Sequence, residues 1–177
     1  MNRKFLKPKK RIVAFIDSQN LNLGTQRMGW KVDWKKFRIF LKEKYGVNEV
    51  YLFIGYLSEN ESMYEYLHDL GYKIVLKPTF SVTKEEAPDK EPKNFVKGNV
   101  DTEIVLMAIK EIKNYSKAII VSADGDFYSL IEYLISKNKL LYIMSPNWQY
   151  STLLKDFKPY IIDLSQHKKE LAYHSKK

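Results

Sequence analysis

Two short apolar runs, each followed at once by carboxylates, constrain this chain more than any other feature. Residues 11–17 read RIVAFID, and residues 117–122 read KAIIVS and continue into Ala123-Asp124-Gly125-Asp126. Apolar runs of this length predict strands that are buried on both faces, as in a parallel sheet covered by helices. A carboxylate at the end of such a strand adds nothing to a core, so Asp17 and Asp124 point to a site.

The remaining pattern alternates helices with further strands. Residues 33–45 show the spacing of an amphipathic helix, with Trp34, Phe37 and Leu41 on one side and Gly46 as a stop. Other helices are expected at 20–28, 61–70, 100–112, 127–136 and 149–156, and other strands at 49–57, 72–77, 140–144 and 160–164. This alternation predicts a three-layer α/β/α fold with a mainly parallel central sheet and right-handed crossovers.

The 177 residues, 45% of them hydrophobic, suit one folded domain. We expect that domain at 11–165, between basic tails at 1–10 and 166–177, with a flexible excursion or irregular hairpin at 79–97, a stretch of prolines and mixed charge. No apolar run is long enough for a transmembrane helix, and the absence of cysteine excludes disulfides and thiol nucleophiles. A cytoplasmic protein is therefore expected, with no membrane partner.

The charge is strongly basic and unevenly distributed. The formal net charge is +9, from 30 lysines and arginines against 21 acidic residues, and basic residues crowd both ends of the chain. Excess positive charge favours polyanions through phosphate contacts, although solvated tails that aid solubility explain it equally well. Nucleic acid is the expected partner, and a homo-oligomer is compatible with the sequence.

The acidic residues predict a metal site. In parallel sheets, ligands bind beyond the carboxyl ends of the strands, where the strand order reverses. If the strands at 11–17 and 117–122 are neighbours, Asp17, Asp124 and Asp126 share a crevice, and Asp101, at the start of the helix expected at 100–112, can face the same place. Carboxylates this close repel one another unless a cation neutralises them, and hard oxygen ligands suit Mg²⁺ or Mn²⁺. Such ions support hydrolysis of phosphodiesters, so all four aspartates are candidate catalytic and metal-binding residues.

Three polar residues are candidates for binding substrate. Asn20 can orient a carboxylate or cap the following helix, and Ser122 can donate to a phosphate or simply end its strand. Lys97, beside Gly98, can balance phosphate charge or stand in solvent as an ordinary loop lysine. Taken singly, each aspartate also has a structural explanation as a turn or cap residue. The joint placement of the acids favours a site.

Three segments together resemble one protein family. They are FIDSQNL (15–21), KGNVDTEIVLMAI (97–109) and SADGDFYSLI (122–131), and in this order they resemble the NYN domain family, a PIN-like nuclease group with bacterial LabA-type members. The resemblance covers roughly residues 11–164. It implies a PIN-like Rossmannoid fold, a divalent metal and ribonuclease activity, so RNA is the expected substrate ahead of DNA.

The same resemblance assigns individual residues. It matches Asp17, Asp101, Asp124 and Asp126 to the acidic positions of the family, and Asn20 to its asparagine. Two departures stand out: Ala123 replaces a more usual glycine, and Asn99 lengthens the lysine-glycine-valine-aspartate run by one residue. The position of Asp101 therefore depends on the conformation of that loop.

Two other functions compete with a nuclease. A non-catalytic RNA-binding or adaptor module would keep the same acids, and Trp30, Trp148 and Tyr150 would suit stacking on bases unless they pack in the core or merely lie at the surface. A haloacid dehalogenase-like phosphatase also has an aspartate after its first strand. It needs a second aspartate two residues later, where Gln19 stands, and is a minor alternative.

Overall fold

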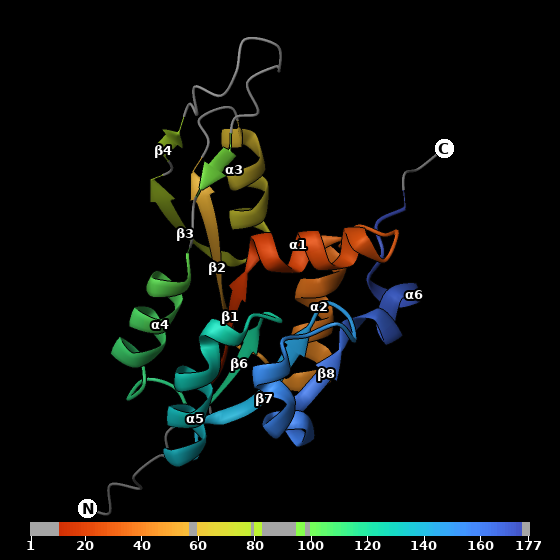
Figure 1. Ribbon diagram of the computed structural model, residues 1–177. Helices are drawn as coiled ribbons and strands as arrows, with labels where there is room; N and C mark the ends of the chain where they lie inside the picture. Colours follow the sequence, from red (N-terminus) through yellow and green to blue (C-terminus); the bar gives the residue numbers. More distant parts are fainter. Residues whose placement is uncertain (1–10, 57–59, 79, 83–94, 98–99, 175–177) are drawn as a thin grey trace, which may run out of the picture.

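The computed structural model describes residues 11–56, 60–78, 80–82, 95–97 and 100–174, and its centre is a six-stranded sheet whose strands all run parallel (Figure 1). The sheet has the order β3-β2-β1-β6-β7-β8. Its strands are β1 (Ile12–Asp17), β2 (Glu49–Tyr56), β3 (Tyr72–Pro78), β6 (Lys117–Val121), β7 (Leu140–Ser145) and β8 (Ile161–Asp163). The predicted α/β fold is confirmed.

The strand order reverses between β1 and β6. After β1 the chain adds β2 and β3 on one side, then returns to place β6 on the other side, with Phe15 beside both Tyr51 and Ile120. The carboxyl ends of β1 and β6 therefore flank the switch point, which is where parallel sheets bind ligands. The two apolar runs of the sequence are neighbours, as the predicted site requires.

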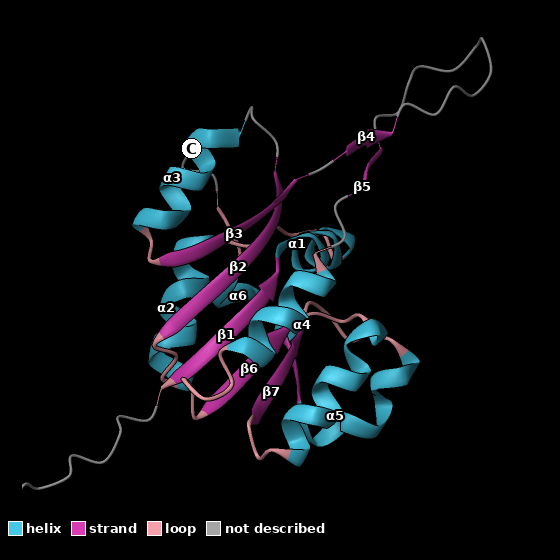
Figure 2. Ribbon diagram, turned by 90° about the vertical axis from the view of Figure 1, so that its left-hand side faces the viewer, coloured by secondary structure: helices cyan, strands magenta, loops and turns pink. Residues whose placement is uncertain are grey.

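Helices cover both faces of the sheet (Figure 2). One face carries α1 (Ser18–Arg27), α2 (Trp34–Tyr45), α3 (Glu61–Asp69) and the short α6 (Lys168–Leu171); the other carries α4 (Asp101–Lys110), α5 (Tyr128–Ser136) and the 3₁₀ helix η3 (Thr152–Tyr160). Successive side chains of β1 alternate between the two cores. Ala14 and Ile16 pack on the first face, and Val13 and Phe15 on the second.

Two helix starts depend on aspartate caps. Asp33 accepts a hydrogen bond from the backbone N–H of Lys36 at 3.1 Å, and α2 ends at Gly46, which has φ 67°. Asp17 likewise accepts from the backbone N–H of Asn20 at 2.9 Å. Helix α1 therefore begins at Ser18, directly after the strand and two residues earlier than expected.

The region 79–97 contains a short antiparallel hairpin of β4 (Phe80–Val82) and β5 (Phe95–Lys97), while residues 83–94 lie outside the described part.

Near the C-terminus, Leu171 and Ala172 are buried, and Ala172 pairs with Val32. The folded part therefore extends beyond the expected boundary at 165, because two apolar residues inside a basic segment reach the core. No helix in the described part of the chain is long and apolar enough to cross a membrane.

Candidate metal centre

Three aspartates converge at the switch point. Each of Asp101, Asp124 and Asp126 offers a carboxylate oxygen, and these oxygens all lie within 4.8 Å of one another. Asp101 is the first residue of α4, whereas Asp124 and Asp126 lie in the turn after β6. Oxygen ligands of an octahedral Mg²⁺, at about 2.1 Å from the ion, stand roughly 3–4 Å apart. The three carboxylates are thus close enough together to be candidate ligands of one divalent cation, and we call them the aspartate triad.

The turn that carries Asp124 is held by its own hydrogen bonds. The Asp124 carboxylate accepts from the backbone N–H of Asp126 at 3.0 Å, and the Ser122 hydroxyl accepts from the backbone N–H of Asp124 at 3.2 Å. A Cβ atom on Gly125 would lie 2.4 Å from the Ser151 hydroxyl and 2.9 Å from a methyl group of Leu153, so a larger residue between the two aspartates would require these side chains to move. This packing fixes the turn as it begins the 3₁₀ helix η2 (Gly125–Phe127).

Asp17 lies next to the triad without being one of its three members. Its side chain, at the end of β1, is 6% exposed. The pKa of Asp17 is raised to about 6, chiefly by burial; the hydrogen bond from the backbone N–H of Asn20 opposes this rise, and the charges of Asp101 and Asp124 add to it. A cation at the triad would favour the ionised form of Asp17 and so lower this pKa.

The candidate substrate-binding residues have different surroundings. The Asn20 side-chain oxygen accepts from the backbone N–H of Ala123 at 2.9 Å, which ties α1 to the turn of the triad. Ser122 is buried beneath that turn and supports it through Asp124. The backbone of Lys97 belongs to β5, but its side chain lies outside the described part of the structure.

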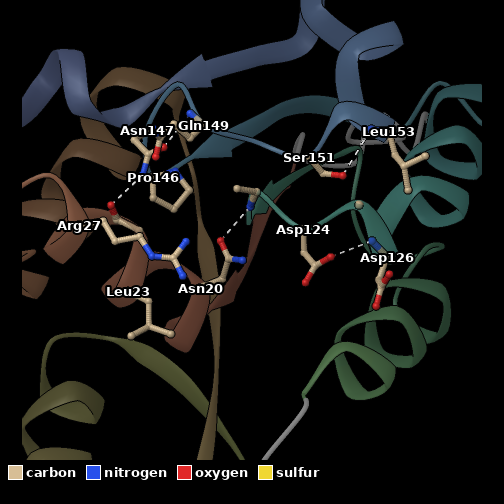
Figure 3. A pocket seen from close by; sticks show the side chains of 13 residues that line it. Asn20, Leu23, Arg27, Asp124, Asp126, Pro146, Asn147, Gln149, Ser151 and Leu153 are labelled. Carbon is tan, nitrogen blue, oxygen red and sulfur yellow. Dashed lines mark hydrogen bonds between the residues drawn. The ribbon is translucent and has the colours of Figure 1, made fainter.

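A pocket of about 320 Å³ adjoins the triad on the side of α1 (Figure 3). It lies between α1, the turn after β6 and the segment after β7. Its lining residues are Asn20, Leu23, Gly24, Arg27, Ala123, Asp124, Gly125, Asp126, Pro146, Asn147, Gln149, Ser151 and Leu153. The sequence analysis did not single out Arg27 or Asn147. The signal for Arg27 was its position seven residues after Asn20, on the same helical face.

The three aromatic residues that could stack on bases differ in how far they are exposed to solvent. Trp30 is 6% exposed and belongs to the core. Trp148 is 62% exposed and stands between the pocket-lining residues Asn147 and Gln149, while Tyr150 is half-buried. Of the three, Trp148 offers the most surface to a partner.

Comparison with known proteins gives a consistent result. The chain is 26% identical over 159 residues to the low amplitude and bright protein LabA of Synechococcus elongatus, covering 88% of this chain and 84% of that protein. Its fold is similar to that of a crystal structure of a protein of unknown function from Vibrio parahaemolyticus, with a TM-score of 0.64 and 21% identity, covering 82% of this chain and 88% of the other. Residues 11–171 match the NYN domain. The chain therefore belongs to the NYN domain family, a nuclease-like group, and carries an acidic cluster that can bind a metal.

Proposed function

We propose that this protein is a divalent-metal-dependent nuclease that hydrolyses phosphodiester bonds in RNA. The observation that carries the proposal is the convergence of Asp101, Asp124 and Asp126 within 4.8 Å at the point where the strand order reverses. Membership of the NYN family and the net charge of +9 support a polyanionic substrate.

In this proposal the aspartate triad holds Mg²⁺ or Mn²⁺, and Asp17 supplies a fourth negative charge beside it. When bound, such an ion lowers the pKa of water and neutralises charge on phosphoryl oxygens. Asp17 is kept in place by its hydrogen bond from the backbone N–H of Asn20, and Asn20 in turn holds the backbone of Ala123. Because this positioning exists before any substrate arrives, the carboxylates need little reorganisation during the reaction.

A cleavage assay tests the proposal. Labelled single-stranded RNA, structured RNA and single-stranded DNA are incubated with the protein in Mg²⁺, Mn²⁺ or EDTA. The test variant is Asp124→Asn, since asparagine can still accept the hydrogen bond from Asp126. The matched control is Glu132→Gln, which removes a charge from an exposed position on α5.

We expect RNA cleavage with metal, none in EDTA, and a loss on the order of 100-fold in Asp124→Asn but not in Glu132→Gln. If wild-type protein binds RNA but cleaves it no faster than Asp124→Asn, the nuclease proposal is wrong. The remaining function would then be a non-catalytic RNA-binding module.

A further inference from the structure

One face of α1 forms a wall of the pocket beside the triad. Asn20, Leu23, Gly24 and Arg27 follow the i, i+3, i+4, i+7 spacing of a single helical face, and all four line the pocket. Arg27 is exposed, and Figure 3 shows its guanidinium directed towards Asn20, with Asp124 on the far side. Within the described ranges, no residue forms an ion pair or hydrogen bond with the Arg27 guanidinium. This cation is therefore available to an anionic ligand.

The opposite wall is fixed in place by close packing and hydrogen bonds. A Cβ on Gly24 would lie 2.4 Å from the Cβ of Pro146, so the segment after β7 rests directly on α1. The Asn147 side-chain amide donates to the Gly24 carbonyl at 2.7 Å, and its oxygen accepts from the backbone N–H of Gln149 at 2.7 Å. Asn147 is buried, and its backbone carbonyl accepts a hydrogen bond from the Ser145 hydroxyl at 2.5 Å. A wall held in this way can bind a ligand without first being ordered.

The pocket offers different chemistry at its two ends. Asp124 and Asp126 lie at one end and Arg27 at the other, with the amide side chain of Asn20 between them (Figure 3). Leu23 and Leu153 add apolar surface, being 47% and 57% exposed. A nucleotide combines a flat apolar ring, polar ring edges and a phosphate anion, which match leucine, amide and guanidinium groups respectively.

The size of the pocket also restricts its occupant. A volume of about 320 Å³ is at the lower end of the range for small-ligand pockets, which extends from about 300 to 1,000 Å³. One base with its sugar fits such a volume, whereas a base that is paired within a duplex cannot enter it. Bases are free to enter only where the strand is unpaired.

We propose that this pocket binds one nucleotide of a single-stranded nucleic acid, with its base between Leu23 and Leu153 and its phosphate on Arg27. The phosphodiester that follows the bound nucleotide would then lie at the aspartate triad, and only this point rests on the proposed function. Arg27 is a binding residue in this arrangement and takes no part in bond cleavage. The substrate preference that follows is for unpaired strands.

Nucleoside monophosphates test the pocket apart from turnover, because they contain no phosphodiester bond. Backbone amide shifts of ¹⁵N-labelled protein are followed by NMR in Mg²⁺ as ribonucleoside and 2′-deoxyribonucleoside 5′-monophosphates, free nucleosides or inorganic phosphate are added. We expect shifts in residues 20–27 and 146–153, and stronger binding of monophosphates than of nucleosides or phosphate alone. Comparison of the two sugars shows whether the pocket distinguishes RNA from DNA.

Matched variants assign the binding to named groups. Arg27→Gln is expected to weaken monophosphate binding about tenfold, and Arg27→Lys by less, because lysine keeps the charge but not the planar fork. Lys110→Gln, which removes a cation from the far end of α4, should leave binding unchanged. Leu23→Asp should weaken binding, while Leu106→Asp, at a leucine of α4 that is 57% exposed, should not.

Equal binding to wild-type protein and Arg27→Gln, or shifts confined to other residues, would overturn this proposal. The result is distinguishable from failure of the proposed function. If no RNA is cleaved but monophosphates bind here in an Arg27-dependent way, the nuclease proposal falls and the nucleotide pocket stands. If RNA is cleaved but no monophosphate binds here, the nuclease proposal stands and the nucleotide pocket is wrong.

Discussion

Glu49 at the amino end of the central sheet and Asp17 at its carboxyl end have opposite electrostatic surroundings. At the amino end, the Glu49 carboxylate is hydrogen-bonded to the guanidinium of Arg11 and lies 2.7 Å from the Lys73 ammonium. Burial alone would raise the pKa of Glu49, but these hydrogen bonds outweigh it and lower the pKa. At the carboxyl end, burial and neighbouring acids raise the pKa of Asp17 to about 6.

Pairing explains the difference. In the described part of the chain, no lysine or arginine forms an ion pair with Asp17, Asp124 or Asp126. The amino end is balanced by the protein's own cations and stabilises the fold. The carboxyl end holds acids whose ionised forms repel one another, an arrangement that is common where a site binds something from outside.

The largest expected effect is on the rate of RNA cleavage, which should depend on Asp17 at the carboxyl end of the sheet but not on Glu49 at the amino end. Asp17→Asn is expected to lower the single-turnover rate of RNA cleavage on the order of 100-fold, because it removes a negative charge beside the triad. Glu49→Gln should leave the rate of the folded enzyme unchanged. The comparison fails if both substitutions lower the rate equally, or if neither does.

The next effect is on stability, and its sign is opposite to the effect on activity. Because the folded pKa of Asp17 exceeds the ordinary value of 3.8, the folded state holds this proton more tightly than the unfolded state. The stabilisation that protonated Asp17 gives the folded state is thus fully present below about pH 4 and is lost as the pH rises through the folded pKa of about 6. In EDTA at pH 8, Asp17→Asn should be more stable than wild type by on the order of 2 kcal/mol, with the gain disappearing near pH 4. Urea unfolding of the two proteins from pH 4 to pH 8 measures the gain at pH 8 and its disappearance near pH 4. An unchanged or lower stability of the variant at pH 8 would contradict the account.

At the amino end the pH dependence should be reversed. The lowered pKa of Glu49 means that its stabilisation is present above the unfolded pKa and is lost as the pH falls through the folded pKa. Glu49→Gln is expected to cost about 1 kcal/mol at pH 7, and less in 1 M salt, because these ion pairs are partly exposed. The same urea experiment checks it. A stability gain at pH 7 would show that the two ends do not differ as described.

The smallest expected effect is a difference in stability between the two ion pairs of Glu49, which differ in how exposed their cations are. Lys73 is 53% exposed and Arg11 only 31%, so the Lys73 pair is better screened by solvent. Lys73→Gln should cost roughly 0.5 kcal/mol, less than Arg11→Gln. Thermal unfolding of the two variants side by side provides the ranking, and the reverse order would refute this explanation.

Local patterns in the sequence predicted the elements that place Asp17 and Asp124. An apolar run that stops at a carboxylate is visible without the fold. That β1 and β6 are neighbours was only a condition of the predicted site, and the structure is what establishes it. The position of Asp101 was less accessible, because the extra residue Asn99 in the lysine-glycine-valine-aspartate run left the placement of Asp101 open in the sequence. The structure nevertheless places Asp101 within the triad.

The pocket could not be predicted, because its walls meet only in three dimensions. Gly24 packs closely on Pro146, and Gly125 on Ser151, so that a Cβ atom at either glycine would require its neighbour to shift. The segment after β7 also differs from the helix expected at 149–156. Ser151 caps a 3₁₀ helix that starts at Thr152 and contains Pro159, and the residues before it are held by Asn147.

Binding of Mn²⁺ tests the central claim most directly, namely that the carboxyl end of the sheet is completed by a divalent cation. Free Mn²⁺ is followed by electron paramagnetic resonance as wild type, Asp124→Asn and Glu49→Gln are added at pH 7.5. The account predicts saturable binding to wild type and Glu49→Gln, competition by Mg²⁺, and loss of that binding in Asp124→Asn. Equal binding to wild type and Asp124→Asn, or none to wild type at millimolar Mn²⁺, would contradict it.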